Sequence, residues 1–244
     1  MDGWPSFLCI VAVQAVVLLL VELLRQRRVD RGPQVHSFGK SLLAGVTVGL
    51  PFGILFDVVL SSHFGLFRYI LHGLPFALLN GLLSYGLAIA TALRLSPLAL
   101  PVMLETRMKI WLGLAAISAL GTIAILVGTH PFVRLVGLGA LIMAVGEFGE
   151  ILALGTYGPV SEVLLGLLGR PLQGWMLVAV VGAVYELANF VCPVWKWASI
   201  GLGSLLVSEV VIAVFGYVVL MHACRAAGML ALAIIAQAQL EPRS

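Results

Sequence analysis

Long apolar stretches separated by short polar breaks run along the whole chain. Seven of them reach the roughly 20 residues that a helix needs to cross about 30 Å of hydrocarbon. They cover residues 6–24, 41–60, 73–93, 110–128, 134–154, 172–191 and 198–221. A further apolar stretch, 226–240, is short, so it is predicted as an interfacial helix or an extension of the seventh span. The pattern predicts an all-α integral membrane protein, a seven-transmembrane-helix bundle in which residues 1–244 form a single polytopic membrane domain.

Composition excludes the main alternatives to a membrane protein. Of the 244 residues, 61% are hydrophobic and only 10% are charged, whereas a soluble domain carries about a quarter charged residues. The 14 Lys and Arg against 11 Asp and Glu leave no basic face for a nucleic acid. We expect a multi-pass protein of the cell membrane whose partners are the bilayer and a lipophilic small molecule, and the oligomeric state stays open.

The basic residues predict the orientation of the bundle. Cytoplasmic loops of membrane proteins are enriched in Lys and Arg. With the N-terminus outside and the C-terminus in the cytoplasm, only three of the 14 cations fall outside, namely Arg68, Arg134 and Lys196. The sequence therefore predicts that orientation, and an odd number of spans agrees with it.

Five acidic residues fall in the interiors of the predicted spans, which contain no Lys or Arg to neutralise them. These are Asp57, Glu147, Glu150, Glu186 and Glu209. Five ionised acids near the middle of a membrane would cost roughly 12–17 kcal/mol in total. We therefore expect most of them to be uncharged, hydrogen-bonded or lining a wet cavity, which makes each a potential proton donor.

Depth in the membrane groups the candidate residues. Asp57 and Asn80 are predicted in the outer third, at the level of Glu186 and Asn189, which share one helix face, and of Tyr185. Two acids and two amides at one depth predict a polar pocket. The alternative is that these side chains are only hydrogen bonds between packed helices.

Other charged residues add to this picture. Glu209 is predicted near the middle of the membrane, and Glu147 with Glu150 form a secondary acidic pair toward the inner side, where extension to water is an alternative. Arg68 lies in an aromatic loop segment, 61–72, where it is available to a phosphate or to Asp57.

Two function classes use these residues, an enzyme and a permease, and a third class, an accessory subunit, does not need them for chemistry. The first is an intramembrane enzyme that acts on an isoprenoid- or lipid-like substrate by carboxylic acid/base chemistry, for example proton-initiated cyclisation or isomerisation. Asp57 and Glu186 would be the acid and its partner, Asn80 and Asn189 would orient them, and Glu209 would be a deeper base. The topology is similar to that of small seven-helix terpene cyclases, a likeness of architecture alone. The alternatives are a proton- or cation-coupled permease with a ladder of carboxylates, and a non-catalytic accessory subunit.

Cofactor and metal motifs are missing from the sequence. No P-loop, HExxH or haem-binding CxxCH pattern occurs, and the three cysteines form no CxxC pair. Three histidines, His63, His72 and His130, fall in predicted outer loops without the spacing of a metal site. We expect neither a cofactor nor a metal.

Overall fold

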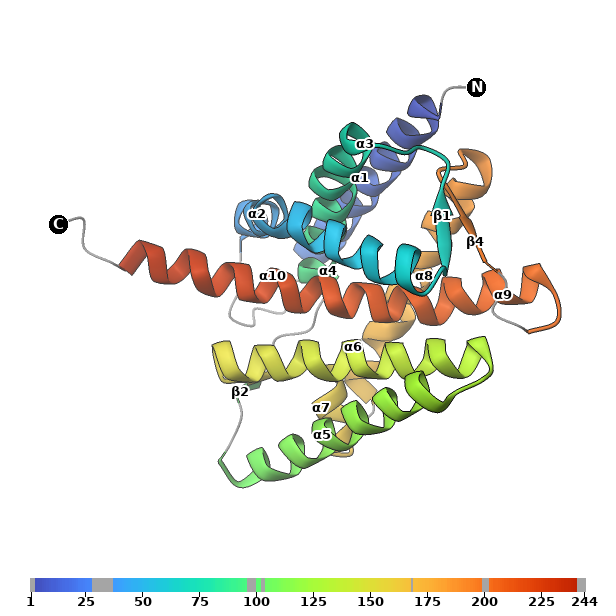
Figure 1. Cartoon of the computed structure of the whole chain (residues 1–244). Coiled ribbons are helices and arrows are strands. Elements are labelled where there is room, and N and C mark those ends of the chain that lie inside the picture. Colours follow the sequence, from blue (N-terminus) through green and yellow to red (C-terminus); the bar gives the residue numbers. More distant parts are fainter. Residues whose placement is uncertain are drawn as a thin grey trace.

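Helices make up nearly all of the regular structure in the computed structural model, which describes residues 3–27, 37–95, 100–101, 104–167, 169–198 and 202–240 (Figure 1). The α-helices are α1 (Trp4–Arg27), α2 (Phe38–Asp57), α3 (Leu74–Leu79), α4 (Gly86–Leu95), α5 (Leu104–Val127), α6 (Pro131–Leu154), α7 (Pro159–Leu164), α8 (Gly169–Val191), α9 (Leu205–Val211) and α10 (Tyr217–Leu240). The π-helical segments are η1 (Val58–His63), η2 (Asn80–Tyr85) and η3 (Ile212–Gly216). The strands are β1 (Phe67–Tyr69), β2 (Leu100–Pro101), β3 (Thr156–Tyr157) and β4 (Trp195–Trp197).

Seven helical segments within the described residues are long and apolar enough to cross a membrane. They cover Trp4–Gln26, Phe38–Asp57, Leu74–Leu95, Thr106–Val127, Pro131–Leu154, Pro171–Val191 and Val207–Gln237. The predicted all-α architecture and the count of seven apolar helices are confirmed. Residues 226–240 were predicted as an interfacial helix or an extension of the seventh span. The structure shows a continuous helix, because α10 continues without a break to Leu240.

The predicted start of the seventh span at residue 198 is wrong by about seven residues, since the helix of that span begins at Leu205. Residues Trp195–Trp197 are extended because they pair with β1. Gly203 then adopts the left-handed conformation (φ +84°), and the side chain of Ser204 accepts a hydrogen bond from the Val207 amide, which caps α9. As a result Glu209 lies near the start of the seventh span and not at its middle.

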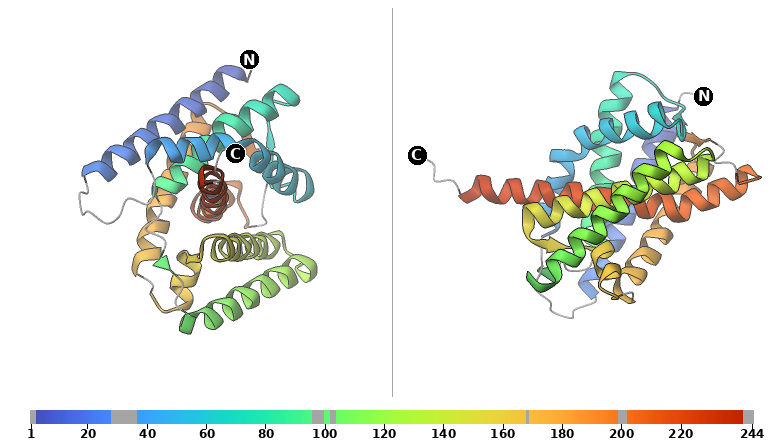
Figure 2. Two further views of the ribbon diagram at one scale, coloured as in Figure 1. Left: turned by 90° about the vertical axis from the view of Figure 1, so that its left-hand side faces the viewer. Right: turned by 60° about the horizontal axis from the view of Figure 1, so that its bottom comes forward.

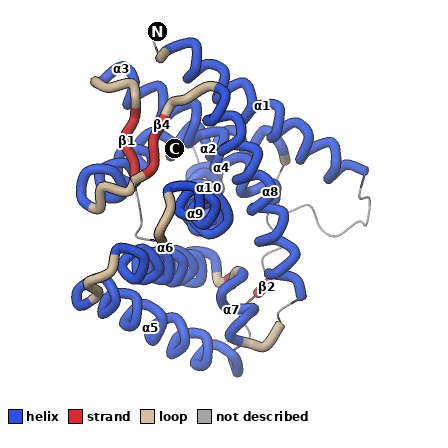
Figure 3. The backbone as a smooth tube through the Cα atoms, turned by 90° about the vertical axis from the view of Figure 1, so that its right-hand side faces the viewer, coloured by secondary structure: helices blue, strands red, loops and turns tan. Residues whose placement is uncertain are grey.

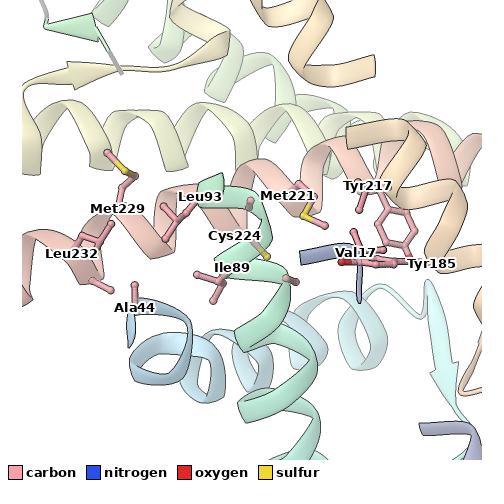
Figure 4. Close-up of a cluster of buried hydrophobic side chains, with 14 residues drawn as sticks. Val17, Ala44, Ile89, Leu93, Tyr185, Tyr217, Met221, Cys224, Met229 and Leu232 are labelled. Atoms are coloured by element: carbon pink, nitrogen blue, oxygen red, sulfur yellow. The ribbon is translucent and has the colours of Figure 1, made fainter. Parts of the chain in front are cut away.

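The helix α10 lies near the centre of the molecule and contacts α2, α4, α6 and α8. Figure 3 shows it end-on, with α6 and α5 on one side, α1, α2 and α4 on the other, and α8 running past it from the level of α7 to that of α1; Figure 2 shows the molecule from two more directions. Its buried face carries Tyr217, Met221 and Cys224, which pack with Ile89 and Ala44 from α4 and α2 (Figure 4). This central packing fixes α10 against the helices that carry the candidate site.

Glycines allow α2 to lie directly against η2 and α4. A Cβ atom added at Gly49 would be 2.7 Å from the carbonyl oxygen of Gly81 and 2.9 Å from the Cα atom of Gly86. Small residues that bring backbones together are a common basis of helix packing in membranes. The close contact of these helices brings the end of α2, which carries Asp57, next to η2.

Two short strand pairs connect loops that are distant in the sequence. The strand β1 pairs antiparallel with β4, and β2 pairs antiparallel with β3. When seven spans cross alternately, the loops that carry β1 and β4 fall on one side, and those that carry β2 and β3 fall on the other. Both strand pairs are therefore consistent with alternate crossing by the seven helices.

Candidate functional site

A cavity of about 640 Å³ lies inside the bundle, a size within the range of about 300–1,000 Å³ that is usual for small-molecule sites. The residues that line it come from α1, α2, η1, β1, η2, α4, α6, α8, β4, α9, η3 and α10. The lining is mostly apolar and aromatic, and includes Phe56, Phe67, Trp175, Trp195 and Phe215. A cavity of this kind suits an apolar ligand.

Several apolar residues that line the cavity are also exposed at the surface of the bundle. Phe132 in the first turn of α6 and Leu172 in the first turn of α8 both line it. Three further lining residues are largely exposed, namely Val136 (54%), Met176 (64%) and Phe215 (66%). An entrance rimmed by exposed apolar side chains favours access from hydrocarbon over access from water.

The first polar group beside the cavity, here called the Asp57 group, consists of Asp57, Tyr69, Asn80 and Tyr85. The Tyr85 hydroxyl donates to Oδ1 of Asp57 at 2.5 Å, and the Tyr69 hydroxyl donates to the same oxygen at 2.9 Å. Nδ2 of Asn80 lies 3.3 Å from Oδ2 of Asp57 and 3.0 Å from the Tyr69 oxygen. The three donor residues line the cavity, so Asp57 is connected to it through them.

Local structure explains how these donors meet. Asp57 is the last residue of α2, and Tyr69 belongs to β1. Asn80 and Tyr85 are the first and last residues of η2. In an α-helix, residues five apart point about 140° away from each other, whereas the wider π-helical turn, with its i to i+5 hydrogen bonds, brings them near one face. The π-helical segment is the reason why Asn80 and Tyr85 both reach Asp57.

Tyr69 lies outside the apolar spans, and its phenol stays neutral. Burial raises the pKa of Tyr69 well above its ordinary value, and the neighbouring Asp57 carboxyl raises it further. The hydroxyl therefore keeps its proton at physiological pH and remains both a donor and an acceptor.

The second polar group, here called the Glu186 group, consists of Glu186, Trp195 and Tyr217. The Tyr217 hydroxyl lies 2.9 Å from Oε1 of Glu186, and Nε1 of Trp195 lies 3.3 Å from the same oxygen. Trp195 and Tyr217 line the cavity, and Glu186 lies behind them. Glu209 is near enough to interact electrostatically with Glu186. Both acids thus contact aromatic donors that form part of the cavity wall.

The strand pair β1–β4 joins the two groups. Tyr69 of the Asp57 group lies opposite Trp195 of the Glu186 group in the register of the strands. Arg68 lies opposite Lys196, and both are exposed, because alternate residues of a strand point to opposite faces. Arg68 is therefore on the face away from Tyr69, which separates it from the Asp57 group.

Asn189 and Tyr185 have supporting positions. Oδ1 of Asn189 accepts the backbone amides of Val194 and Trp195 at 2.9 and 3.1 Å, and its Nδ2 donates to the Trp195 carbonyl at 3.0 Å. Asn189 therefore holds the turn that presents Trp195 to Glu186. Tyr185 is buried and lines the cavity, and its ring lies 5.9 Å from that of Tyr217 (Figure 4).

The acidic pair Glu147 and Glu150 lies elsewhere, fully buried between α6, α7 and α10. Glu147 accepts the backbone amides of Val160 and Ser161 at 3.1 and 2.8 Å and the Ser161 hydroxyl at 3.1 Å. Glu150 forms an ion pair with Arg225, with Nη1 2.9 and 2.8 Å from its two oxygens. The contacts of both acids are therefore internal to the protein, and neither residue extends to water.

The ion pairs correct one expectation from the sequence. We expected no cation within a span, but Arg225 lies inside the seventh span, Val207–Gln237, and Arg94 lies at the end of the third and pairs with Glu22. The seventh span was expected to end before Arg225, and its extension through α10 brings this cation into the bundle. The argument from unpaired acids consequently applies to Asp57 and Glu186, but not to Glu150.

Sequence reasoning missed the side chains that contact the acids. Tyr85 and Tyr217 were not singled out, and Tyr69 was considered only as part of the aromatic loop segment 61–72. Tyr and Trp side chains usually find a hydrogen-bond partner when they are buried. A Tyr or Trp in a segment expected to pack beside a buried acid could therefore have been proposed as its partner. Among the described residues, no three His, Cys, Asp or Glu side chains come together as a metal site would require.

Comparison of the chain with protein-family models, with curated proteins and with solved structures finds no match in any of the three.

Proposed function

We propose that the protein is an intramembrane enzyme that protonates a lipophilic, isoprenoid- or lipid-like substrate and returns a cyclised or isomerised product. The observation that carries the proposal is the apolar cavity with two carboxyl groups behind its wall, each hydrogen-bonded to aromatic donors that line it. Acid catalysis on a hydrocarbon needs a proton source, an apolar chamber and a base, and these two groups and the cavity supply candidates for all three.

The proton would travel through the tyrosines. In the structure both tyrosine hydroxyls donate to Asp57. When Asp57 is protonated, one of these hydrogen bonds would reverse, so that the carboxyl donates to the oxygen of Tyr85 or Tyr69 and that hydroxyl gives its own proton to a carbon of a substrate double bond. A new C–H bond forms, and the neighbouring carbon becomes a cation. A second double bond of the substrate attacks this carbon to close a ring, or the cation loses a proton directly.

The cavity wall would stabilise the cation. Trp, Tyr and Phe faces attract positive charge, by about 2 kcal/mol or more when desolvated. Trp195, Phe67 and Trp175 line the cavity and can provide such faces. The proton that the product releases would pass to Glu186 through Tyr217, so the substrate and product have the same mass and no co-reactant is consumed.

Orientation and location are part of the same proposal. We infer that the N-terminus is outside and the C-terminus cytoplasmic in the cell membrane, because that arrangement leaves only Arg68, Arg134 and Lys196 outside. The end of the cavity beside β1–β4 would then lie toward the outer surface. Glu209 would lie near that surface, where it could exchange protons between Glu186 and water.

Deuterium incorporation tests the proposal without a known substrate. Proteoliposomes in D₂O are incubated with linear isoprenoids, geranylgeraniol and squalene, and the products are analysed by chromatography and mass spectrometry. The expected result is a product that is an isomer of the probe carrying one carbon-bound deuterium. Asp57→Asn and Glu186→Gln should abolish it, and Tyr85→Phe should reduce it at least tenfold.

Tyr157→Phe is the matched control, since Tyr157 is buried in β3 and does not line the cavity. Its product yield should equal that of the wild type. Equal yields for the wild type, Asp57→Asn and Glu186→Gln would refute the assigned roles. Probe-independent proton or cation flux that Glu209→Gln reduces, with no deuterated product, would favour the permease instead.

A further inference from the structure

Two of the three cysteines lie in contact at one end of the bundle. Cys9 is in the second turn of α1, and Cys192 directly follows α8. Their sulfur atoms are 2.6 Å apart, and both residues are half-buried. The third, Cys224, is completely buried in α10 among the central apolar side chains (Figure 4).

Packed surroundings hold the two cysteines together. Phe7 and Ile10, which flank Cys9 on α1, are each 1% exposed and pack in one cluster with Phe76 and Val194. The Cys192 amide donates to the Ala188 carbonyl at 2.7 Å, which continues the helical hydrogen bonding past α8. The contact between the sulfurs thus depends on two well-anchored backbones.

We propose that Cys9 and Cys192 form a disulfide that ties α1 to the connection between α8 and β4. The two thiols lose two protons and two electrons as the S–S bond forms. The disulfide of a thiol–disulfide exchange protein accepts the two electrons and two protons and becomes two thiols. Such oxidation occurs outside the cytosol. The proposal therefore rests on the outward orientation of this end as well as on the contact, but not on any catalytic role.

The disulfide would act on the segment that carries Trp195. That segment runs from Cys192 to β4 and is already fixed by Asn189, and it holds the Trp195 indole at Glu186. The bond joins residues 183 positions apart, and a crosslink across so long a stretch strongly restricts the unfolded chain. Reduction should lower the melting temperature of the wild type and of Cys224→Ser, and leave that of Cys9→Ser unchanged.

Counting free thiols tests the pairing directly. Cells expressing the full chain are quenched with acid, and the protein is denatured and alkylated with N-ethylmaleimide without reductant before intact-mass analysis. The wild type should take one label, on Cys224. Cys224→Ser should take none, Cys9→Ser and Cys192→Ser should take two each, and the wild type should take three after reduction.

Three labels on the unreduced wild type would overturn the disulfide. Lys196, which is exposed on β4, reports the orientation separately through a membrane-impermeant amine reagent added to intact cells. Three free thiols with a labelled Lys196 would refute the disulfide but support the outward orientation of this end of the bundle. Three free thiols with an unlabelled Lys196 would refute both, and neither result affects the deuterium test of catalysis.

Discussion

Removing one partner of the buried ion pair between Arg225 and Glu150 should strongly destabilise the protein. Their side chains are only 4% and 0% exposed, so neither charge can turn to solvent when its partner is lost. Breaking a pair buried to this degree typically costs about 3–5 kcal/mol. For a chain of this size, one kcal/mol corresponds to about 2–4 °C of melting temperature. Arg225→Met should therefore lower the melting temperature by roughly 6–20 °C.

The double variant separates the charge from the packing. Glu150→Gln combined with Arg225→Met removes both charges and keeps similar side-chain volumes, so most of the loss should be recovered, because an apolar or neutral replacement of a buried pair is often nearly neutral. The assay is thermal unfolding of purified protein in detergent, followed by tryptophan fluorescence, for both single variants and the double variant.

A more exposed ion pair is the control. Arg94 and Glu22 pair with side chains that are 7% and 12% exposed, so Arg94→Met should cost less than Arg225→Met. If Arg225→Met melts within about 2 °C of the wild type, or if the losses of the two single variants simply add in the double variant, the assignment of Glu150 and Arg225 as a coupled structural pair is refuted.

Two further predictions concern the cavity and the helix contact beside it. Ala140→Phe fills the cavity and should abolish deuterated product while the protein still folds; Ala116→Phe, on the exposed face of α5, should leave the yield unchanged, and equal yields would refute this cavity as the reaction chamber. Gly49→Ala places a Cβ atom 2.9 Å from the Cα atom of Gly86 and should cost about 1–3 kcal/mol in thermal unfolding. Gly39→Ala, with nothing within 4 Å of the added atom, should be neutral or slightly stabilising, and equal melting temperatures for both variants would contradict the close contact of α2 with α4.

Much of the fold could be predicted from hydropathy. Apolar length alone located the seven helices, because a membrane-spanning segment must satisfy its backbone hydrogen bonds internally and present apolar side chains to lipid. The seventh span was misplaced because its start depends on the pairing of β4 with β1, a contact between residues about 130 positions apart in the sequence. No local pattern around Trp195 contains that information.

The candidate site could be predicted only in part. Asp57, Asn80 and Glu186 were found because polar side chains are conspicuous in apolar spans, and the structure brings Asn80 to Asp57. Tyr85 was missed because α-helical spacing turns it away from Asn80, whereas η2 brings it back. Glu150 was misjudged because its partner Arg225 comes from a helix 75 positions later.

The sequence by itself indicated a membrane protein, the number of its apolar helices and the few polar side chains within them. Each of these follows from the transfer free energy of residues taken in order along the chain. The tertiary structure decided which acid receives which partner. Asp57 and Glu186 meet tyrosines and an indole at the cavity wall, while Glu150 meets an arginine. Such pairings depend on how helices and strands that are far apart in sequence are packed, and the order of residues within a single helix does not specify them.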